Sequence, residues 1–351
     1  MHFAFLGLLT EHYMTGIIAT VGPATESPKT IEAMVIAGAT HFRLNFSHGD
    51  HSWHERTIHT LKTIAPHIPI ILDTKGPEIR TGDIAKKMVL EADSWLTLTT
   101  KAENANPEEQ IIFVSHAGLP QDVEIGDYIA LDSGLIVIRV LETKETEIIT
   151  RVIYPGVLES RRHLNLMGKN ASLPTLTKGD KEDIAFGLAQ GIDIIALSFA
   201  RDAECITETQ NLCTNAGRPA VKIWAKIENS TGYENREKIA IVADGIMVAR
   251  GDLGVETPFE ELPAKQAELV KVCEKHGIFS IVATEMMESM IEKPRPTRAE
   301  ISDVALAGWQ KASLTMLSAE TGVGKYPIET IKMMRKILDA AERSGITIQR
   351  S

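Results

Sequence analysis

The chain has 351 residues, of which 44% are hydrophobic and 5% aromatic, a composition typical of one large α/β domain with a smaller one. Its 47 acidic and 37 basic residues give a formal net charge of −10 without a long run of either sign, so we expect no nucleic-acid partner. The three cysteines, Cys205, Cys213 and Cys273, form no C-x-x-C pair and indicate a reducing compartment.

The first 13 residues contain a short apolar run but neither a basic leader nor a signal-peptide cleavage site. No stretch elsewhere is long enough to span a bilayer. We therefore predict a cytoplasmic protein with no membrane partner, and we interpret residues 1–13 as an N-terminal extension of a chain that naturally begins at Met14.

Apolar runs of strand length alternate with amphipathic helical segments along most of the chain. Eight such runs are centred on residues 17–19, 40–44, 68–72, 192–197, 221–227, 245–248, 279–283 and 313–317. Apolar residues spaced three and four apart predict helices at 27–37, 53–64, 180–190, 203–215, 263–276 and 327–341. Eight strand and helix units predict an α/β fold of the (β/α)8 TIM-barrel type, whose reactive residues lie at the carboxyl ends of the strands.

One interval breaks this alternation, because residues 82–168 have short alternating runs and turn signals but no convincing helix. We predict a barrel formed by residues 14–81 and 169–345, with residues 82–168 inserted as a small β-rich lid domain. Such an insertion would lie over the active-site face and could exclude water from the chemistry.

Polar side chains follow nearly every predicted strand. A single polar residue there is best explained as a helix cap or turn former, but the same end of eight successive strands indicates a site. The residues are Thr20, Pro23, Arg43, Asn45, Ser47, Asp73, Thr74, Arg80, Ser198, Lys226, Glu228, Arg250, Asp252, Thr284, Ser318 and Glu320.

Two predicted strands, in VKIWAKIEN and DGIMVARGDLG, end in paired charges. Side chains two apart on a strand point to the same side, so Lys226 with Glu228, and Arg250 with Asp252, should each be presented together. Glu228 and Asp252 suit a divalent cation such as Mg²⁺, beside which Lys226 could meet the charge of a moving phosphoryl group. The pattern predicts phosphoryl transfer.

Cationic and small residues at other strand ends suit the same chemistry. Arg43 and Arg80 supply further cationic donors. Gly251 would allow a substrate to approach the backbone closely, and Thr284 could relay a proton.

A second cluster offers hard oxygen ligands with one formal charge, which fits a monovalent cation. Its members are Asn45, Ser47, Asp73 and Thr74. The alternative is a turn network in which Asn45 and Ser47 satisfy backbone groups, and spacing alone does not separate the two.

Five strings together resemble the pyruvate kinase family. They are RLNFSHG, LDTKGPEIRTG, AKIEN, MVARGDLG and KPRPTRAE, and the resemblance extends over residues 14–342. It implies a (β/α)8 barrel with a small β-barrel lid and the conversion of phosphoenolpyruvate and ADP to pyruvate and ATP, with Mg²⁺ (or Mn²⁺) and K⁺ as cofactors.

The resemblance also implies residue roles. Lys226, Thr284 and Arg43 would be catalytic, and the substrate would contact Arg43, Lys226, Gly251, Asp252 and Thr284. Glu228 and Asp252 would bind Mg²⁺, while Asn45, Ser47, Asp73 and Thr74 would bind K⁺, in keeping with Glu78, which matches members that need a monovalent cation. The nucleotide would contact Asn45, Phe46, Ser47, His48, Arg80 and Arg162, the last in place of a lysine.

Several positions depart from the family pattern. Glu285 replaces a glutamine, residues 306–311 replace a differently patterned run, and KGVNLPG appears as RHLNLMG, with His163 and Met167 at the lid hinge. Glu285 and residues 306–311 motivate an alternative, a catalytically weak or inactive paralogue that binds phosphoenolpyruvate or nucleotide in a regulatory role. Because the sequence ends at Ser351, we also expect a short form without the C-terminal allosteric domain, and a homo-oligomer that would form through barrel surfaces.

Overall fold

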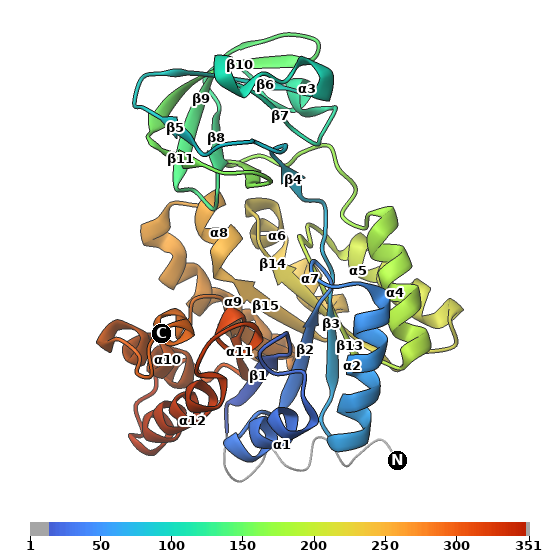
Figure 1. Cartoon of the computed structure of the whole chain (residues 1–351). Helices are drawn as coiled ribbons and strands as arrows, with labels where there is room; N and C mark the ends of the chain where they lie inside the picture. The colour runs from blue at the N-terminus through green and yellow to red at the C-terminus, as the bar shows by residue number, and fades with distance from the viewer. Residues whose placement is uncertain (1–13, 349–351) are drawn as a thin grey trace.

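Eight parallel strands close into a barrel in the computed structural model, which describes residues 14–348 (Figure 1). The strand order β1-β17-β16-β15-β14-β13-β3-β2 returns to β1. The strands are β1 (Gly16–Thr20), β2 (His41–Asn45), β3 (Ile70–Asp73), β13 (Ile194–Leu197), β14 (Lys222–Ile227), β15 (Gly245–Ala249), β16 (Phe279–Ala283) and β17 (Leu314–Leu317). The predicted (β/α)8 barrel is confirmed, whereas the predicted extension at residues 1–13 lies outside the described residues.

Helices cover the outside of the barrel. The long ones are α1 (Pro28–Ala37), α2 (His51–Ile64), α4 (Lys178–Gln190), α5 (Ala203–Asn215), α9 (Leu262–His276), α10 (Arg298–Trp309) and α12 (Pro327–Arg343). Shorter helices and turns are α6 (Ser230–Glu234), α7 (Arg236–Val242), α8 (Arg250–Glu256), α11 (Ala319–Gly322), η3 (Phe259–Glu261) and η4 (Glu288–Ile291). Capping boxes begin α4 at Thr177 and α10 at Thr297, which satisfies backbone N–H groups at both helix starts.

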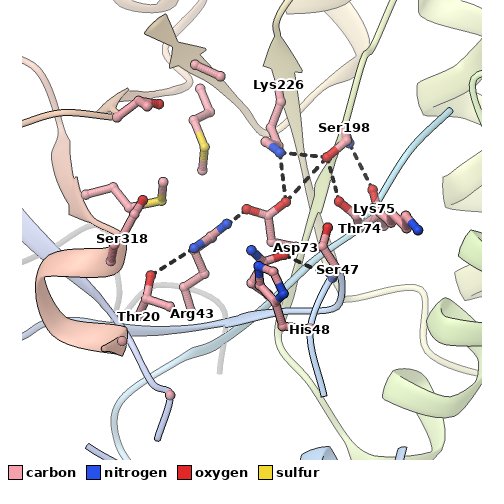
Figure 2. Close-up of a pocket in the computed structure, with 18 of the residues that line it drawn as sticks. Thr20, Arg43, Ser47, His48, Asp73, Thr74, Lys75, Ser198, Lys226 and Ser318 are labelled. Atoms are coloured by element: carbon pink, nitrogen blue, oxygen red, sulfur yellow. Dashed lines mark hydrogen bonds and ion pairs between the residues drawn. The ribbon is translucent and has the colours of Figure 1, made fainter. Parts of the chain in front are cut away.

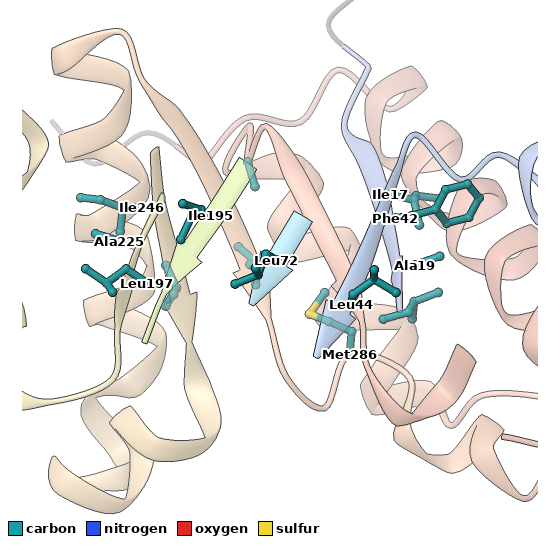
Figure 3. Packing of buried hydrophobic residues seen from close by; sticks show 14 of the residues in the cluster. Ile17, Ala19, Phe42, Leu44, Leu72, Ile195, Leu197, Ala225, Ile246 and Met286 are labelled. Carbon is teal, nitrogen blue, oxygen red and sulfur yellow. The ribbon is translucent and has the colours of Figure 1, made fainter. Parts of the chain in front are cut away.

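The barrel strands are largely apolar because both of their faces are buried. Ile18 of β1 points into the barrel with Ile71 and Trp224, while its neighbours Ile17 and Ala19 pack against the surrounding helices (Figure 3). Alternate side chains of a strand point to opposite faces, so each strand serves the inner and the outer core. This double burial places the polar positions at the strand ends.

The insertion between β3 and α4 is a curled sheet that stands over the carboxyl ends of the barrel strands (Figure 1). Its order is β4-β12-β8-β9-β10-β6-β7, and an antiparallel bridge between Thr81 and Val114 links the two outer strands. The elements are β4 (Ile79–Arg80), β5 (Met88–Leu90), β6 (Trp95–Thr99), η1 (Ala102–Asn104), η2 (Pro107–Glu109), β7 (Ile111–Phe113), α3 (Leu119–Asp122), β8 (Tyr128–Leu131), β9 (Ile136–Thr143), β10 (Glu147–Tyr154), β11 (Gly156–Leu158) and β12 (His163–Leu166).

The insertion has a hydrophobic core of its own. Leu96, Leu98, Ile129, Ile138 and Val140 are fully buried there and form a cluster distinct from the two clusters of the barrel. The sheet already includes β4 at residues 79–80, so the boundaries of 82 and 168 stay a prediction.

The insertion meets the barrel at α8 and at the returning segment after β12. Glu256 of α8 lies in a small cavity of about 30 Å³ that Lys169, Asn170 and Arg201 also line. Its Oε2 atom is buried and has no hydrogen-bond partner among residues 14–348. Burial raises the pKa of Glu256 to about 8.

Truncation of a core side chain in the insertion should destabilise that unit. Leu98→Ala removes a fully buried side chain, and we expect a cost of about 2–5 kcal/mol. Hydrogen exchange should rise across residues 82–168 and stay unchanged in the barrel strands. Leu135→Ala, at a leucine that is 71% exposed in the same unit, is the matched control. If hydrogen exchange accelerated equally in the barrel and in the insertion, the insertion would not be an independently stabilised domain.

Glu256 should make stability fall as pH rises. Its folded pKa lies above the ordinary glutamate value of 4.5, so between pH 4.5 and about pH 8 the folded state binds more protons than the unfolded state. This group then lowers the free energy of unfolding by up to about 1.4 kcal/mol per pH unit in that window. Urea unfolding of Glu256→Gln at pH 5.5, 6.5 and 7.5 should show a growing advantage over the wild type.

The exposed residue Glu260 provides the control, since Glu260→Gln should leave the slope unchanged. Arg201, Asp252 and Glu228 also act on Glu256 electrostatically and are present in both proteins. A wild-type slope in Glu256→Gln would show that Glu256 is not the source.

Candidate active site

A cavity of about 690 Å³ opens at the carboxyl ends of the barrel strands (Figure 2). Most of the residues predicted from the strand ends line it together. They are Thr20, Pro23, Arg43, Asn45, Ser47, Asp73, Thr74, Ser198, Lys226, Glu228, Asp252, Thr284 and Ser318, and His48, a predicted nucleotide contact, lines it as well.

A buried carboxylate joins two cations at the base of this cavity. Asp73 is fully buried at the end of β3, and its Oδ2 accepts a hydrogen bond from Arg43 Nε at 2.5 Å. Its Oδ1 lies 2.9 Å from Lys226 Nζ (Figure 2). Burial alone would raise the pKa of Asp73, but the charges of Arg43 and Lys226 hold it below its usual value. Asp73 is therefore ionised and fixes the two cations.

Lys226 is the central cation of the site. Burial by itself lowers its pKa, but Asp73 and Glu228 outweigh that effect and raise it, so the amine stays protonated. Nζ lies 3.0 Å from Glu228 Oε1 and donates to Ser198 Oγ at 2.6 Å. The predicted pairing of Lys226 with Glu228 is confirmed.

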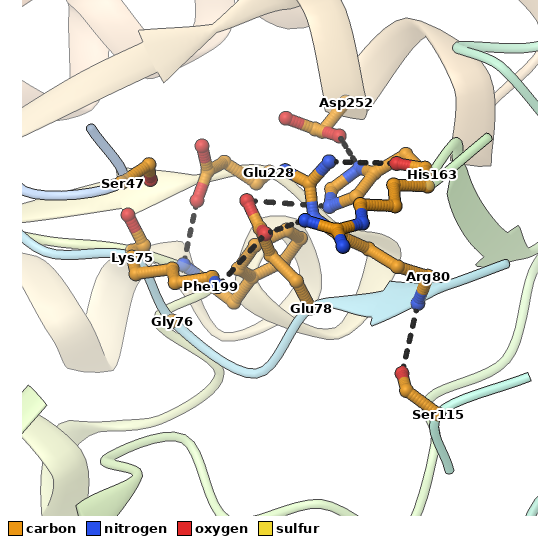
Figure 4. Close-up of polar contacts among 12 residues, drawn as sticks. Ser47, Lys75, Gly76, Glu78, Arg80, Ser115, His163, Phe199, Glu228 and Asp252 are labelled. Atoms are coloured by element: carbon orange, nitrogen blue, oxygen red, sulfur yellow. Dashed lines mark hydrogen bonds and ion pairs between the residues drawn. The ribbon is translucent and has the colours of Figure 1, made fainter. Parts of the chain in front are cut away.

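Glu228 and Asp252 line the same cavity, so two carboxylates bring negative charge close together there. Burial raises the pKa of Glu228 to about 7, Lys226 opposes this, and Asp252 adds to it. Glu228 Oε2 accepts a hydrogen bond from Phe199 N–H at 2.6 Å (Figure 4). A cation beside the two carboxylates would relieve this crowding, so the donor set fits Mg²⁺ or Mn²⁺.

Any divalent cation here would depend on ligands from outside the protein. Within residues 14–348 no cluster of three or more His, Cys, Asp or Glu side chains is suited to hold a metal ion. Mg²⁺ commonly binds through one or two carboxylates and completes its octahedron with water and substrate phosphate oxygens. Glu228 and Asp252 match that pattern.

The predicted pairing of Arg250 with Asp252 is wrong. The chain turns helical at Arg250, and residues two apart on a helix face different directions. Arg250 instead points toward α10, where its Nη1 lies 2.7 Å from Asp303 Oδ1. Its Nη2 donates to the Thr284 carbonyl at 2.6 Å. Arg250 therefore supports the loop that carries Thr284.

Thr284 and Gly251 approach each other closely. Thr284 has φ +74°, an uncommon conformation for a β-branched residue. A Cβ atom at Gly251 would lie 3.0 Å from Thr284 Cγ2, so the absence of a side chain permits this approach. Gly251 itself lies outside the cavity lining.

The predicted monovalent-cation ligands also line the cavity. Asn45 Oδ1 accepts a hydrogen bond from Ser47 N–H at 3.0 Å, as the turn-network alternative requires. Thr74 Oγ1 accepts from Ser198 N–H at 2.9 Å. Hydroxyl, amide and carboxylate oxygens still face one space, so their chemistry fits K⁺, and the two interpretations coexist.

Three predicted nucleotide contacts lie outside the cavity lining and stay predictions. Arg80 Nε donates to Glu78 Oε2 at 2.8 Å (Figure 4). Arg162 pairs with Glu159 and Asp132 in the insertion. Phe46 is buried and stacks on His54, with ring centroids 3.8 Å apart.

The main residue whose role sequence analysis missed is His163 of β12. Its Nε2 lies 3.3 Å from Glu78 Oε1, and its Nδ1 lies 3.6 Å from Asp252 Oδ1 (Figure 4). Burial lowers its pKa, but contact with Asp252 and Glu78 raises it to about 9 overall. The departure at position 163 was the only signal in the sequence, and it did not reveal the partners.

Two other departures lie away from the cavity lining. Glu285 is exposed, although it follows Thr284 in the chain. Residues 306–311 lie at the end of α10, where Trp309 Nε1 donates to Ser344 Oγ and Gln266 Nε2 donates to Gln310 Oε1.

Among residues 14–348, no helix is both long and apolar enough to cross a membrane. The cytoplasmic location stays a prediction.

Comparison with known proteins adds to this geometry. A family model described as pyruvate kinase, barrel domain, matches residues 12–331. The chain is 42% identical over 348 residues to a pyruvate kinase of Geobacillus stearothermophilus, covering 96% of this chain and 59% of the relative. It is 40% identical to pyruvate kinase 2 of Synechocystis, with 95% and 57% covered, and 39% identical to plastidial pyruvate kinase 2 of Arabidopsis thaliana, with 93% and 57% covered.

The chain thus spans somewhat more than half the length of these curated relatives. The family model covers most of the barrel and the whole insertion, including each predicted site residue. The chain belongs to the pyruvate kinase family.

Proposed function

We propose that this chain is a phosphotransferase that converts phosphoenolpyruvate and ADP to pyruvate and ATP. The single observation that carries the proposal is the buried arrangement of Lys226 between Asp73 and Glu228 at the cavity. A fixed ammonium in a buried site stabilises the charge of a transferring phosphoryl group without reorganisation during the step.

Lys226, Arg43 and Thr284 are the catalytic residues in this proposal. Arg43 is buried, and its Nη1 donates to Thr20 Oγ1 at 2.9 Å, so its guanidinium is held ready for the substrate's phosphate or carboxylate. Thr284, which lines the cavity, relays a proton to the enol carbon. Gly251 and Asp252 complete the substrate contacts.

Two kinds of cation assist. Glu228 and Asp252 hold Mg²⁺ or Mn²⁺, which supplies electrostatic stabilisation of the phosphoryl oxygens when bound. Asn45, Ser47, Asp73 and Thr74 hold K⁺ near the phosphate region. Their shared lining of one cavity supports both assignments.

The nucleotide binds between the barrel and the insertion. Asn45, Phe46, Ser47 and His48 border it from β2, and Arg80 and Arg162 contact its phosphates from the insertion side. Arg162 is paired with acidic residues in the structure, so its guanidinium would have to turn toward the nucleotide. The insertion, a domain of residues 82–168, acts as the lid that excludes water.

The alternative of a weak regulatory paralogue receives little support from the site. Glu285 and residues 306–311, which motivate it, do not line the cavity. We also propose a cytoplasmic protein that forms homo-oligomers through barrel surfaces.

Replacement of Lys226 should abolish most turnover. Lys226→Met removes the ammonium, and we expect kcat to fall by about 10²–10³-fold or more, as for the loss of other preorganised stabilisers. Pyruvate formation is measured with lactate dehydrogenase, with Mg²⁺ present and K⁺ either added or replaced by Na⁺. The wild type should require K⁺.

Lys222→Met is the matched control, because Lys222 begins the same strand and is exposed. Lys226→Arg keeps the charge and the partner of Asp73 but not the geometry, so it separates loss of chemistry from loss of folding. Equal kcat in wild type and Lys226→Met would overturn the assigned role. If the wild type binds phosphoenolpyruvate but forms no pyruvate, the proposed phosphotransferase activity is wrong.

A further inference from the structure

His163 is the side chain through which the insertion reaches the barrel's metal-binding carboxylates. It begins β12, which pairs with β4 so that His163 lies opposite Arg80. The ring touches Glu78 with one nitrogen and Asp252 with the other (Figure 4). It thus joins the segment entering the insertion, the strand leaving it and helix α8 of the barrel.

These contacts are largely shielded from water. The side chains of His163, Glu78 and Asp252 are 18%, 10% and 32% exposed. His163 Nε2 is buried and makes no hydrogen bond of good geometry among residues 14–348. Its contacts with the two carboxylates are therefore ion-pair contacts and not well-formed hydrogen bonds. Glu78 is further fixed by the hydrogen bond from Arg80. The two carboxylates thus fix the position of the ring, although neither forms a well-aligned hydrogen bond with it.

Asp252 cannot serve His163 and a divalent cation equally well. A cation beside Glu228 and Asp252 would attract the carboxylate whose Oδ1 faces Nδ1, and the N–H and the metal would compete for its negative charge and lone pairs. Two ligands that compete for one group weaken each other by the same factor. Whatever strengthens the contact of His163 with Asp252 therefore weakens metal binding, and the metal loosens the insertion.

We propose that His163 is a positioning residue that competes with the divalent cation for Asp252 and so couples metal binding to the attachment of the insertion. The proposal rests on the assignment of Glu228 and Asp252 as metal ligands made under the proposed function.

The test is direct Mn²⁺ binding to the full chain without substrates, followed by the electron paramagnetic resonance signal of free Mn²⁺. His163→Gln should bind Mn²⁺ more tightly than the wild type, by about fivefold or more. The matched control is His116→Gln, because His116 is also a histidine of the insertion paired with an aspartate, Asp122, but away from the cavity lining. Its Kd for Mn²⁺ should equal that of the wild type.

Hydrogen exchange supplies a second readout. Mn²⁺ should accelerate exchange in β12 of the wild type and do so less in His163→Gln, which lacks the imidazole that faces Asp252. His163→Gly, which has no side chain to reach Asp252, should show no acceleration, and it replaces His163→Gln in both measurements if that variant folds poorly.

The outcomes separate the two proposals. Mn²⁺ binding to wild type and His163→Gln with the same Kd, or weaker binding to the variant, overturns the role of His163 and leaves the metal site standing. Failure of both proteins to bind Mn²⁺ overturns the metal site, and the competition with it.

Discussion

A buried carboxylate, Asp73, sets the geometry of the barrel's reactive end. An unpaired charge in such a place would be costly, and removal of one partner of a buried pair typically costs about 3–5 kcal/mol. Asp73 therefore requires both Arg43 and Lys226, which come from β2 and β14 on either side. The strand register places Asn45 opposite Asp73, so the same constraint aligns the hydroxyl and amide groups nearby. The ion pairs of Asp73 with Arg43 and Lys226 therefore hold all three side chains in place.

The excess of negative charge then determines what the cavity can bind. Arg43 and Lys226 together hold the pKa of Asp73 low, whereas Lys226 is the main cation that acts on Glu228, and the pKa of Glu228 remains raised. Asp252 adds to this imbalance from the start of α8, which follows β15 directly. A site that holds a fixed ammonium beside a carboxylate with a raised pKa, Glu228, favours a divalent cation together with an anionic substrate. That combination is what phosphoryl transfer needs.

The insertion is both a separate structural unit and a neighbour of this charge balance. Its core is independent of the barrel's, yet His163 and Glu256 bring ionisable groups to its junction with α8. Burial at this junction leaves the Oε2 atom of Glu256 without a hydrogen-bond partner among the described residues, which is energetically unfavourable for a carboxylate.

The sequence by itself determined the barrel, the insertion and most of the cavity lining, because strands buried on both faces are largely apolar and leave polar residues mainly at their ends. It paired Lys226 with Glu228 correctly, since both lie at the end of an extended strand. It failed for Arg250, because a strand and a helix cannot be told apart at the residue where one becomes the other. The contacts of His163 with Glu78 and Asp252 were decided only by the tertiary structure. They join residues 85 and 89 positions apart in the chain, and no local spacing carries that information.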